Sequence, residues 1–106
     1  MPSLKVFIDT KKPVSDADLE ELNNVVVKGL EAHGEHAVVV VVPDAKVNLS
    51  GCYVELTCRH KANRTPELLQ ALAEDLDRTT RSLFSLSDPV RVRIIMVEEN
   101  LLGAVN

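Results

Sequence analysis

The strongest constraint on the fold is the spacing of apolar residues, which changes twice from a strand pattern to a helix pattern and back. In the first half, residues 4–8 alternate as a strand does. Residues 19–30 carry apolar side chains at three- and four-residue intervals, as one face of a helix does. Residues 38–42 are an unbroken run of valine. β-Branched residues favour strands, and such a run is typical of a strand buried on both faces.

The second half repeats this order. Residues 52–59 alternate cleanly, residues 66–85 carry a leucine stripe at helical spacing, and residues 90–97 form a last apolar strand. The element order is therefore β-α-β-β-α-β. Each crossover is long enough to join parallel strands with its helix on one face of the sheet. We predict an α/β (α+β) fold with two pseudo-repeated βαβ units, a four-stranded sheet and two helices on one face.

Capping residues mark the predicted helix boundaries. Ser15 and Thr65 have the short hydroxyl side chains that favour the N-cap position. Pro66 suits the first helical position. Gly34 is expected to end the first helix.

Length and charge limit the classes of protein that fit this chain. The 106 residues predict one domain over residues 1–106. The net charge of −4 argues against non-specific nucleic-acid binding, which needs a basic face. The N-terminus has no signal-peptide pattern, and the longest apolar run, residues 37–43, is too short to cross a membrane. We expect a cytoplasmic protein with no membrane or nucleic-acid partner.

The two cysteines, Cys52 and Cys58, are expected to be core thiols. They lie six residues apart in one predicted strand, so their Cα atoms would be roughly 20 Å apart, which is beyond disulfide reach. Neither has a Cys or His neighbour at the spacing of a zinc site. The sequence predicts no metal and no cofactor.

Four short segments carry a resemblance to a known family. Pro2 follows the initiator Met and leads directly into the first strand, and the second strand ends in Val-Val-Pro-Asp at 41–44. Arg59 ends the third strand and precedes Arg64-Thr65 at the second helix, and the last strand ends in Val-Glu-Glu-Asn at 97–100. In their joint placement these segments resemble the tautomerase superfamily, which includes macrophage migration inhibitory factor, malonate semialdehyde decarboxylase and cis-chloroacrylate dehalogenase.

The resemblance implies a cofactor-independent enzyme with Pro2 as the catalytic residue. It also implies a homotrimer whose sites form between subunits. The arginine pattern is most similar to that of the decarboxylases and dehalogenases, but the water-activating residues of the dehalogenases have no match here. We therefore expect enol–keto tautomerisation of a small α-keto or enol carboxylate, with decarboxylation of a β-keto acid as the alternative.

The residue types suit this chemistry. Once Met1 is removed, Pro2 is a secondary amine, and an ordinary α-amino group has a pKa of about 8. Burial or nearby cations lower this pKa, and the neutral amine then takes a proton from carbon or oxygen, or attacks a carbonyl carbon. A guanidinium binds a carboxylate through two parallel hydrogen bonds and stabilises an enolate. Arg59 and Arg64 are the candidates for these tasks.

Each assignment has an alternative. If Met1 is retained, Pro2 is an amide and cannot act as a base. Arg59 and Arg64 fit a solvated basic rim as well as a substrate site. Tyr53 shares the strand face of Arg59 and fits either the core or a substrate pocket. Solvent-facing positions are expected for the charged residues beside them, namely His60, Lys61, Glu98 and Glu99.

The same element order belongs to ferredoxin-like modules, which bind a small ligand or a protein and perform no chemistry. The two folds differ in strand pairing. Neighbouring strands of a ferredoxin-like sheet are antiparallel, whereas in the tautomerase arrangement each helix-linked pair is parallel. A tautomerase fold used only for protein interaction is a third interpretation.

Overall fold

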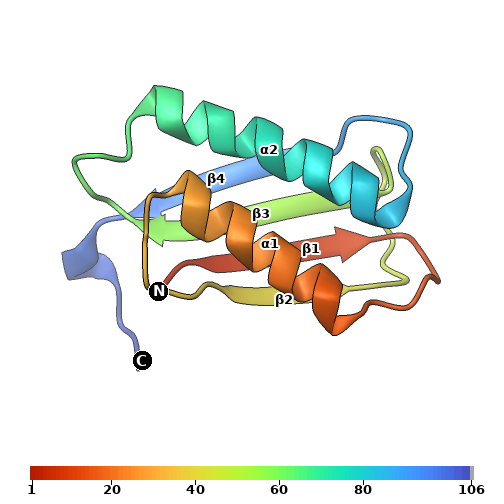
Figure 1. Cartoon of the computed structure of the whole chain (residues 1–106), viewed down its shortest axis with the longest axis horizontal. Coiled ribbons are helices and arrows are strands. Elements are labelled where there is room, and N and C mark those ends of the chain that lie inside the picture. Colours follow the sequence, from red (N-terminus) through yellow and green to blue (C-terminus); the bar gives the residue numbers. More distant parts are fainter. Residues whose placement is uncertain (106) are drawn as a thin grey trace.

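The computed structural model describes residues 1–105, and its elements follow the predicted order (Figure 1). The elements are β1 Ser3–Ile8, α1 Asp16–Gly29, β2 Val38–Val42, β3 Cys52–Arg59, α2 Pro66–Phe84, β4 Arg91–Val97 and a short 3-10 turn, η1, Glu99–Leu101. Both helices lie on one face of the sheet and leave the other face open (Figure 1). Within residues 1–105, neither helix combines the length and the apolar character that a membrane crossing requires.

The strand pairing decides between the tautomerase and the ferredoxin-like arrangement of the sheet. The strand order is β2-β1-β3-β4. β1 is parallel to β2 and β3 is parallel to β4, while the central strands β1 and β3 are antiparallel. Each helix therefore joins two parallel neighbours, which is the tautomerase arrangement and not the ferredoxin-like one. The predicted fold class is confirmed.

The first strand and the helix start of each βαβ unit correspond at an offset of 50 residues, whereas the outer strands β2 and β4 do not keep this offset. Ser15 caps α1, and Thr65, which lies 50 positions later, caps α2. The first buried residue of β1, Leu4, corresponds in the same way to Val54 of β3. The units are thus related by an approximate two-fold axis between β1 and β3. Where the two units differ, the shared strand, cap and helix do not by themselves require the residue.

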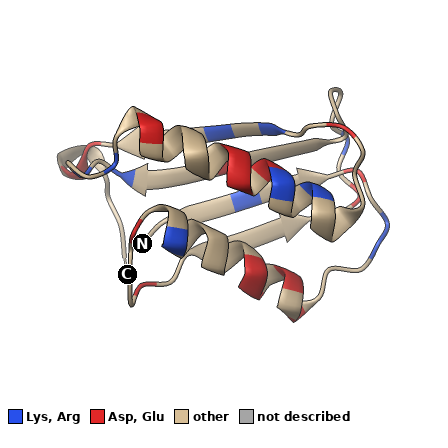
Figure 2. Ribbon diagram, turned by 45° about the horizontal axis from the view of Figure 1, so that its top comes forward, with Lys and Arg blue, Asp and Glu red and all other residues tan. Residues whose placement is uncertain are grey.

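Local sequence sets the start of both helices. The Ser15 hydroxyl accepts a hydrogen bond from the Asp18 N–H, and the Asp18 carboxylate accepts one from the Ser15 N–H, which forms a capping box. The Thr65 hydroxyl accepts from the Leu68 N–H. Acidic residues in the first turn of α1 and Lys28 in its last turn complement the helix dipole. Figure 2 shows acidic residues near one end of this helix and a basic residue near the other.

The first helix ends earlier than predicted. Its last residue is Gly29, and Gly34, the expected stop, lies in the following turn with φ of 81°. The cause is Ala32, which is buried and whose N–H donates to the Val27 carbonyl oxygen at 2.9 Å. A hydrogen bond to the carbonyl five residues earlier closes a helix C-terminus, so the chain turns back to the core at this point.

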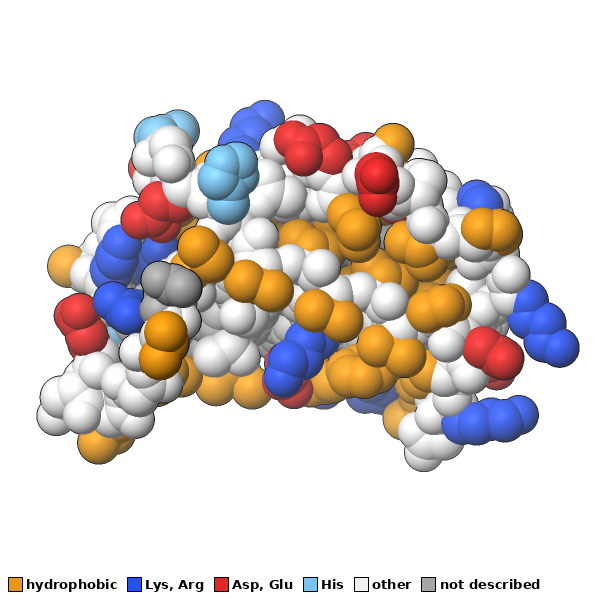
Figure 3. All heavy atoms as spheres, turned by 90° about the horizontal axis from the view of Figure 1, so that it is seen from below, with side chains coloured by type: hydrophobic (Ala, Val, Ile, Leu, Met, Phe, Trp, Pro, Cys, Tyr) orange, Lys and Arg blue, Asp and Glu red, His pale blue; other side chains and the backbone are white. Residues whose placement is uncertain are grey.

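The second strand is half exposed, so the prediction that it is buried on both faces was wrong. Val39 and Val41 pack toward the helices. Val38, Val40 and Val42 face the other way and expose 46, 45 and 37% of their surface. Valine satisfies the strand preference, but nothing within residues 1–105 covers the open face of the sheet. Figure 3 shows hydrophobic side chains gathered along the side of the molecule that carries this strand.

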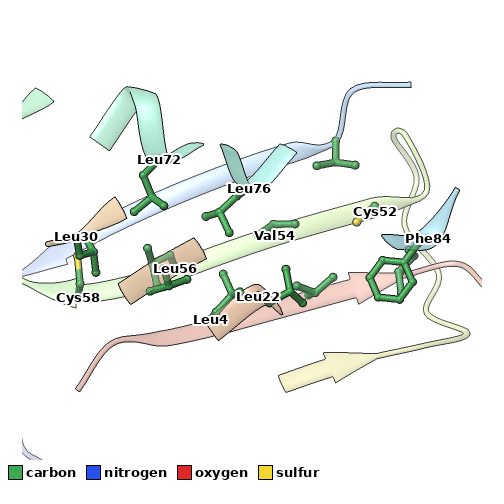
Figure 4. Packing of buried hydrophobic residues seen from close by; sticks show 14 of the residues in the cluster. Leu4, Leu22, Leu30, Cys52, Val54, Leu56, Cys58, Leu72, Leu76 and Phe84 are labelled. Atoms are coloured by element: carbon green, nitrogen blue, oxygen red, sulfur yellow. The ribbon is translucent and has the colours of Figure 1, made fainter. Parts of the chain in front are cut away.

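The core lies between the helices and the central strands. Figure 4 shows Leu72 and Leu76 directed from α2 onto β3, where Leu56 is fully buried. Cys52 and Cys58 are free thiols on this same face of β3, as predicted. Burial, helped by a nearby carboxylate, raises the pKa of Cys52 to about 11.

Candidate active site

Segments that are far apart in the sequence meet at one end of the sheet (Figure 1). The N-terminus, the α1–β2 connection, the end of β3 with the loop that follows it, and the start of η1 enclose a cavity of about 100 Å³. Its lining consists mainly of polar and charged side chains, with Met1, Pro2, Glu35, Arg59, His60, Lys61, Arg64 and Glu99 as members. The carboxyl ends of parallel neighbours lie at one edge of a sheet, which is why the end of β3 faces the turn after β4.

Pro2 is buried and is held through the backbone. Its carbonyl oxygen accepts a hydrogen bond from the Val38 N–H at 2.8 Å. The pairing of Ser3 with Thr57 sets it beside the end of β3. In this structure Met1 precedes it, so the Pro2 nitrogen is an amide; Met1 itself is 60% exposed.

Arg64 is the one charged side chain that is buried among residues 1–105, with 5% exposure. Its Nη1 donates to the Arg59 carbonyl oxygen at 2.7 Å. Its Nε is buried and finds no hydrogen-bond partner in the described part of the chain, and no ion pair there includes Arg64. Burying an uncompensated charge costs several kcal/mol. A buried guanidinium without a carboxylate is therefore a strong candidate for binding an anion.

The Cys58 thiol lies against this guanidinium. Burial raises the pKa of Cys58, and the charge of Arg64 together with a hydrogen bond from it opposes that rise. The thiol is a weak acceptor and does not neutralise the arginine.

Arg59 is placed differently from Arg64. It is half-exposed, and its Nη1 forms an ion pair with Glu99 Oε1 at 3.2 Å. Its Nε is also buried without a hydrogen-bond partner among residues 1–105. Figure 2 shows basic and acidic residues close together at this end of the sheet.

The structure does not bring Tyr53 to this cavity. Tyr53 stands six positions before Arg59 at the other end of β3 and lines a separate hollow with Phe7 and Lys46. Its hydroxyl donates to Glu55 Oε2 at 2.8 Å, and this bond raises the pKa of Tyr53. Strand alternation predicts which face of the sheet a side chain occupies. The cavity, however, lies at one end of the strands, and Tyr53 is at the opposite end.

Two further lining residues, Glu35 and Glu99, were not among the predicted site residues. His60 and Lys61 are exposed as expected, yet they also line the cavity. The signal for Glu99 lay in the predicted parallel pairing, because it places residues just beyond β4 next to the last residue of β3. Within residues 1–105 no cluster of three or more His, Cys, Asp or Glu side chains is placed to hold a metal ion.

Known structures share this fold over almost its whole length. The macrophage migration inhibitory factor of Trichinella spiralis matches with a TM-score of 0.81 and 12% identity, covering 96% of this chain and 95% of that one. A homologue of that factor from Prochlorococcus marinus matches at 0.80 and 16%, covering 97% and 95%. A fused wild-type 4-OT described as a symmetric trimer matches at 0.69 and 23%, covering 98% and 92%.

Sequence comparison adds nothing to this likeness, since no family model and no curated protein matches the chain. At these identities the structures share a fold with the chain. That fold is the one of the tautomerase superfamily, so the resemblance predicted from the sequence is confirmed at the level of the fold.

Proposed function

We propose that this protein is a cofactor-independent tautomerase that interconverts the enol and keto forms of a small carboxylate, with Pro2 as the general base. The observation that carries this proposal is Arg64, a buried guanidinium without a carboxylate partner among residues 1–105, which lines the same small cavity as Pro2. The substrate carboxylate supplies the missing counter-charge. An anion held there lies beside the residue that would perform the proton transfer.

The proposed base is the amine that forms when Met1 is removed. Pro2 is buried, and the same cavity is lined by three cationic side chains, Arg59, Lys61 and Arg64, against two carboxylates, so desolvation and the excess of positive charge both favour the neutral amine and lower its pKa. The neutral nitrogen takes a proton from the enol oxygen or from the carbon next to the carbonyl, and it returns that proton at the other position. Arg59 and Arg64 stabilise the enolate between these two transfers.

The lining of the cavity limits the size of the substrate. Apart from Met1 and Pro2, every lining residue is charged or polar, and no Phe, Tyr or Trp is among them. The volume is about 100 Å³ with Met1 in place, and removal of Met1 adds the space of that residue, which together suit an acid of few carbon atoms. We therefore favour a small 2-oxo acid over an acid with an aromatic group.

Decarboxylation of a β-keto acid is the second candidate, favoured by the same polar lining. The Pro2 nitrogen would add to the ketone carbon and water would leave, which forms an iminium ion. Carbon dioxide then departs, its bonding electrons passing into the iminium to give an enamine. Protonation at carbon and hydrolysis release the ketone and the free amine.

We further propose that copies of the chain assemble into a homotrimer through the open face of the sheet. The exposed valines Val38, Val40 and Val42 support this, because a single chain leaves them in water. The fused 4-OT structures with this fold are described as trimers. Light scattering should give three chains per particle, and Val40→Lys, which puts a charge on this face, should lower that number.

One substrate tests both activities. Oxaloacetate is an enolisable 2-oxo acid and also a β-keto acid, so loss of enol absorbance reports tautomerisation and formation of pyruvate reports decarboxylation. Intact mass first establishes that Met1 is absent. Pro2→Ala replaces the ring nitrogen with a primary amine that the proline ring no longer orients, and it is expected to reduce the rate by up to about a hundredfold, the usual scale for removing a general base.

The matched control is a chain with one extra, unprocessed residue before Pro2, which keeps the proline but makes it an amide. Both variants should lose activity, and the extended chain, which has no amine at this place, should lose at least as much as Pro2→Ala. Borohydride reduction during turnover should link substrate to Pro2 only if the iminium route operates. A rate that survives in both variants, or no rate from a confirmed Pro2 terminus, would refute the amine mechanism and favour a binding role for the fold.

A further inference from the structure

The two arginines of the site differ in a way that bears on substrate choice. Arg64 has no carboxylate partner among residues 1–105, whereas Arg59 Nη1 is 3.2 Å from Glu99 Oε1. Both guanidiniums line the same cavity. The site therefore has one guanidinium without a carboxylate partner among residues 1–105 and one that is already paired with a carboxylate of the protein.

We propose that Glu99 is a specificity-determining residue, because its carboxylate holds the position on Arg59 that a second substrate carboxylate would take. A monocarboxylate binds through Arg64 without disturbing this ion pair. A dicarboxylate uses both guanidiniums only after it displaces Glu99. This inference rests on the proposed function, since it assigns the first substrate carboxylate to Arg64.

Glu99 is placed so that it can be displaced. Its side chain is 75% exposed, and the one ion pair that it forms among residues 1–105 is with Arg59. It is the first residue of the short turn η1, whose backbone is closed by the Leu102 N–H on the Glu99 carbonyl at 3.2 Å. An exposed ion pair is weak in water. The carboxylate therefore competes with a dianion without excluding it.

The close linkage of the two arginines supports a shared ligand. Arg64 Nη1 donates to the backbone carbonyl of Arg59 at 2.7 Å, so the two residues are held together by a direct bond. In addition, the His60 N–H donates to the Val97 carbonyl at 3.0 Å, which ties this loop to the end of β4, two residues before Glu99. A short dicarboxylate would meet both guanidiniums in one cavity.

The test uses two acids that undergo no reaction here, acetate and malonate, with binding to the mature protein measured by calorimetry. In Glu99→Gln the malonate affinity is expected to rise about twofold to fivefold relative to acetate, the range that corresponds to one exposed ion pair. Glu98→Gln is the matched control. It removes the same charge one residue away, and Glu98 forms no ion pair among residues 1–105.

The gain should disappear when Arg59→Gln is added, because the competition is for Arg59. Equal gains for acetate and malonate, or an equal gain in Glu98→Gln, would show an effect of net charge and overturn the inference. Neither acid needs the Pro2 amine, so the selectivity should persist in Pro2→Ala. If Glu99→Gln shifts the malonate preference as expected but Pro2→Ala leaves turnover unchanged, the proposed function is refuted and this inference stands. If Pro2→Ala removes turnover but Glu99→Gln does not shift the preference, this inference alone is refuted.

Discussion

Replacing Arg64 with methionine is expected to stabilise the fold while it removes activity. Arg64 is 5% exposed and carries a charge that no carboxylate among residues 1–105 compensates. The equivalent position in the first βαβ unit, 50 residues earlier, is Val14, an apolar side chain that packs against the core. The fold therefore accepts an apolar residue at this place, and methionine fills a volume close to that of arginine.

The magnitude follows from two opposing contributions. An uncompensated buried charge costs several kcal/mol after relaxation. The hydrogen bond from Arg64 to the Arg59 carbonyl returns about 1.5 to 3 kcal/mol, as a bond from a charged donor does. We expect the free energy of unfolding to rise by about 1 to 3 kcal/mol in Arg64→Met. For a chain of this size each kcal/mol raises Tm by about 4 to 8 °C.

The assay pairs unfolding with turnover at one protein concentration, since assembly makes Tm depend on concentration. The kcat/KM for oxaloacetate is expected to fall by about a hundredfold, the scale for losing one donor to a developing negative charge. Arg81→Met is the matched control. Arg81 Nη2 pairs with Asp77 Oδ2 at 2.9 Å, so the same substitution there should lower stability and leave turnover unchanged. A less stable Arg64→Met with normal turnover would show that Arg64 is structural.

Three further changes test the fold. A Cβ on Gly29 would lie 2.4 Å from Leu72 Cδ1 of the second helix, which is too close for two carbon atoms. The cost of this overpacking exceeds the gain from the better helix propensity of alanine, so Gly29→Ala should lower the free energy of unfolding, measured in urea, by about 1 to 2 kcal/mol. Gly103→Ala, whose Cβ would meet no atom of residues 1–105 within 4 Å, is the control, and equal losses would refute the contact. The Thr80 hydroxyl is buried and has no hydrogen-bond partner among residues 1–105, so Thr80→Val should raise the free energy of unfolding by about 1 kcal/mol. Thr79→Val is the control and should change this free energy little. A less stable Thr80→Val would show that the hydroxyl does form a hydrogen bond. Burial and Asp77 raise the pKa of Cys52 from 9.0 to about 11, so the folded protein holds this proton more tightly than the unfolded chain does. The thiol should leave the free energy of unfolding unchanged below pH 9 and reduce it by up to about 2 to 3 kcal/mol as the pH rises toward 11. In urea titrations at pH 8 to 11, Cys52→Ala should make the free energy of unfolding depend less on pH.

The sequence predicts the elements well because their signals are local. The hydroxyls of Ser15 and Thr65 cap the helices through bonds to residues three positions away. The alternation of residues 52–59 gives the buried and open faces of β3 correctly. The exposure of β2 was not predictable in this way, because five valines have the same pattern in a central strand and in an edge strand, and strand order decides between them.

The site is predictable in part, and the difference lies in how its residues come together. Pro2 and Arg59 are strand-end residues, so a topology with the right pairing brings them to one edge. Tyr53 has the correct face but the wrong end of its strand. Glu99 interacts with a residue 40 positions away, and neither its own neighbours nor its charge distinguishes it from Glu98.

The internal repeat separates residues that the fold needs from residues that serve a function. Both units build the same strand, cap and helix, yet the positions of Arg59 and Arg64 are Asp9 and Val14 in the first unit. Packing alone therefore requires neither arginine. A difference between the two units does not by itself indicate a functional residue. The buried Thr80 stands where the first unit has Leu30, yet Thr80 does not line the cavity that holds Pro2 and Arg64. Among residues 1–105, a buried charge, a cavity and a neighbouring proline that processing could free occur together only around Arg64. This combination, more than any one of its parts, argues that Arg64 serves a function and not only the fold.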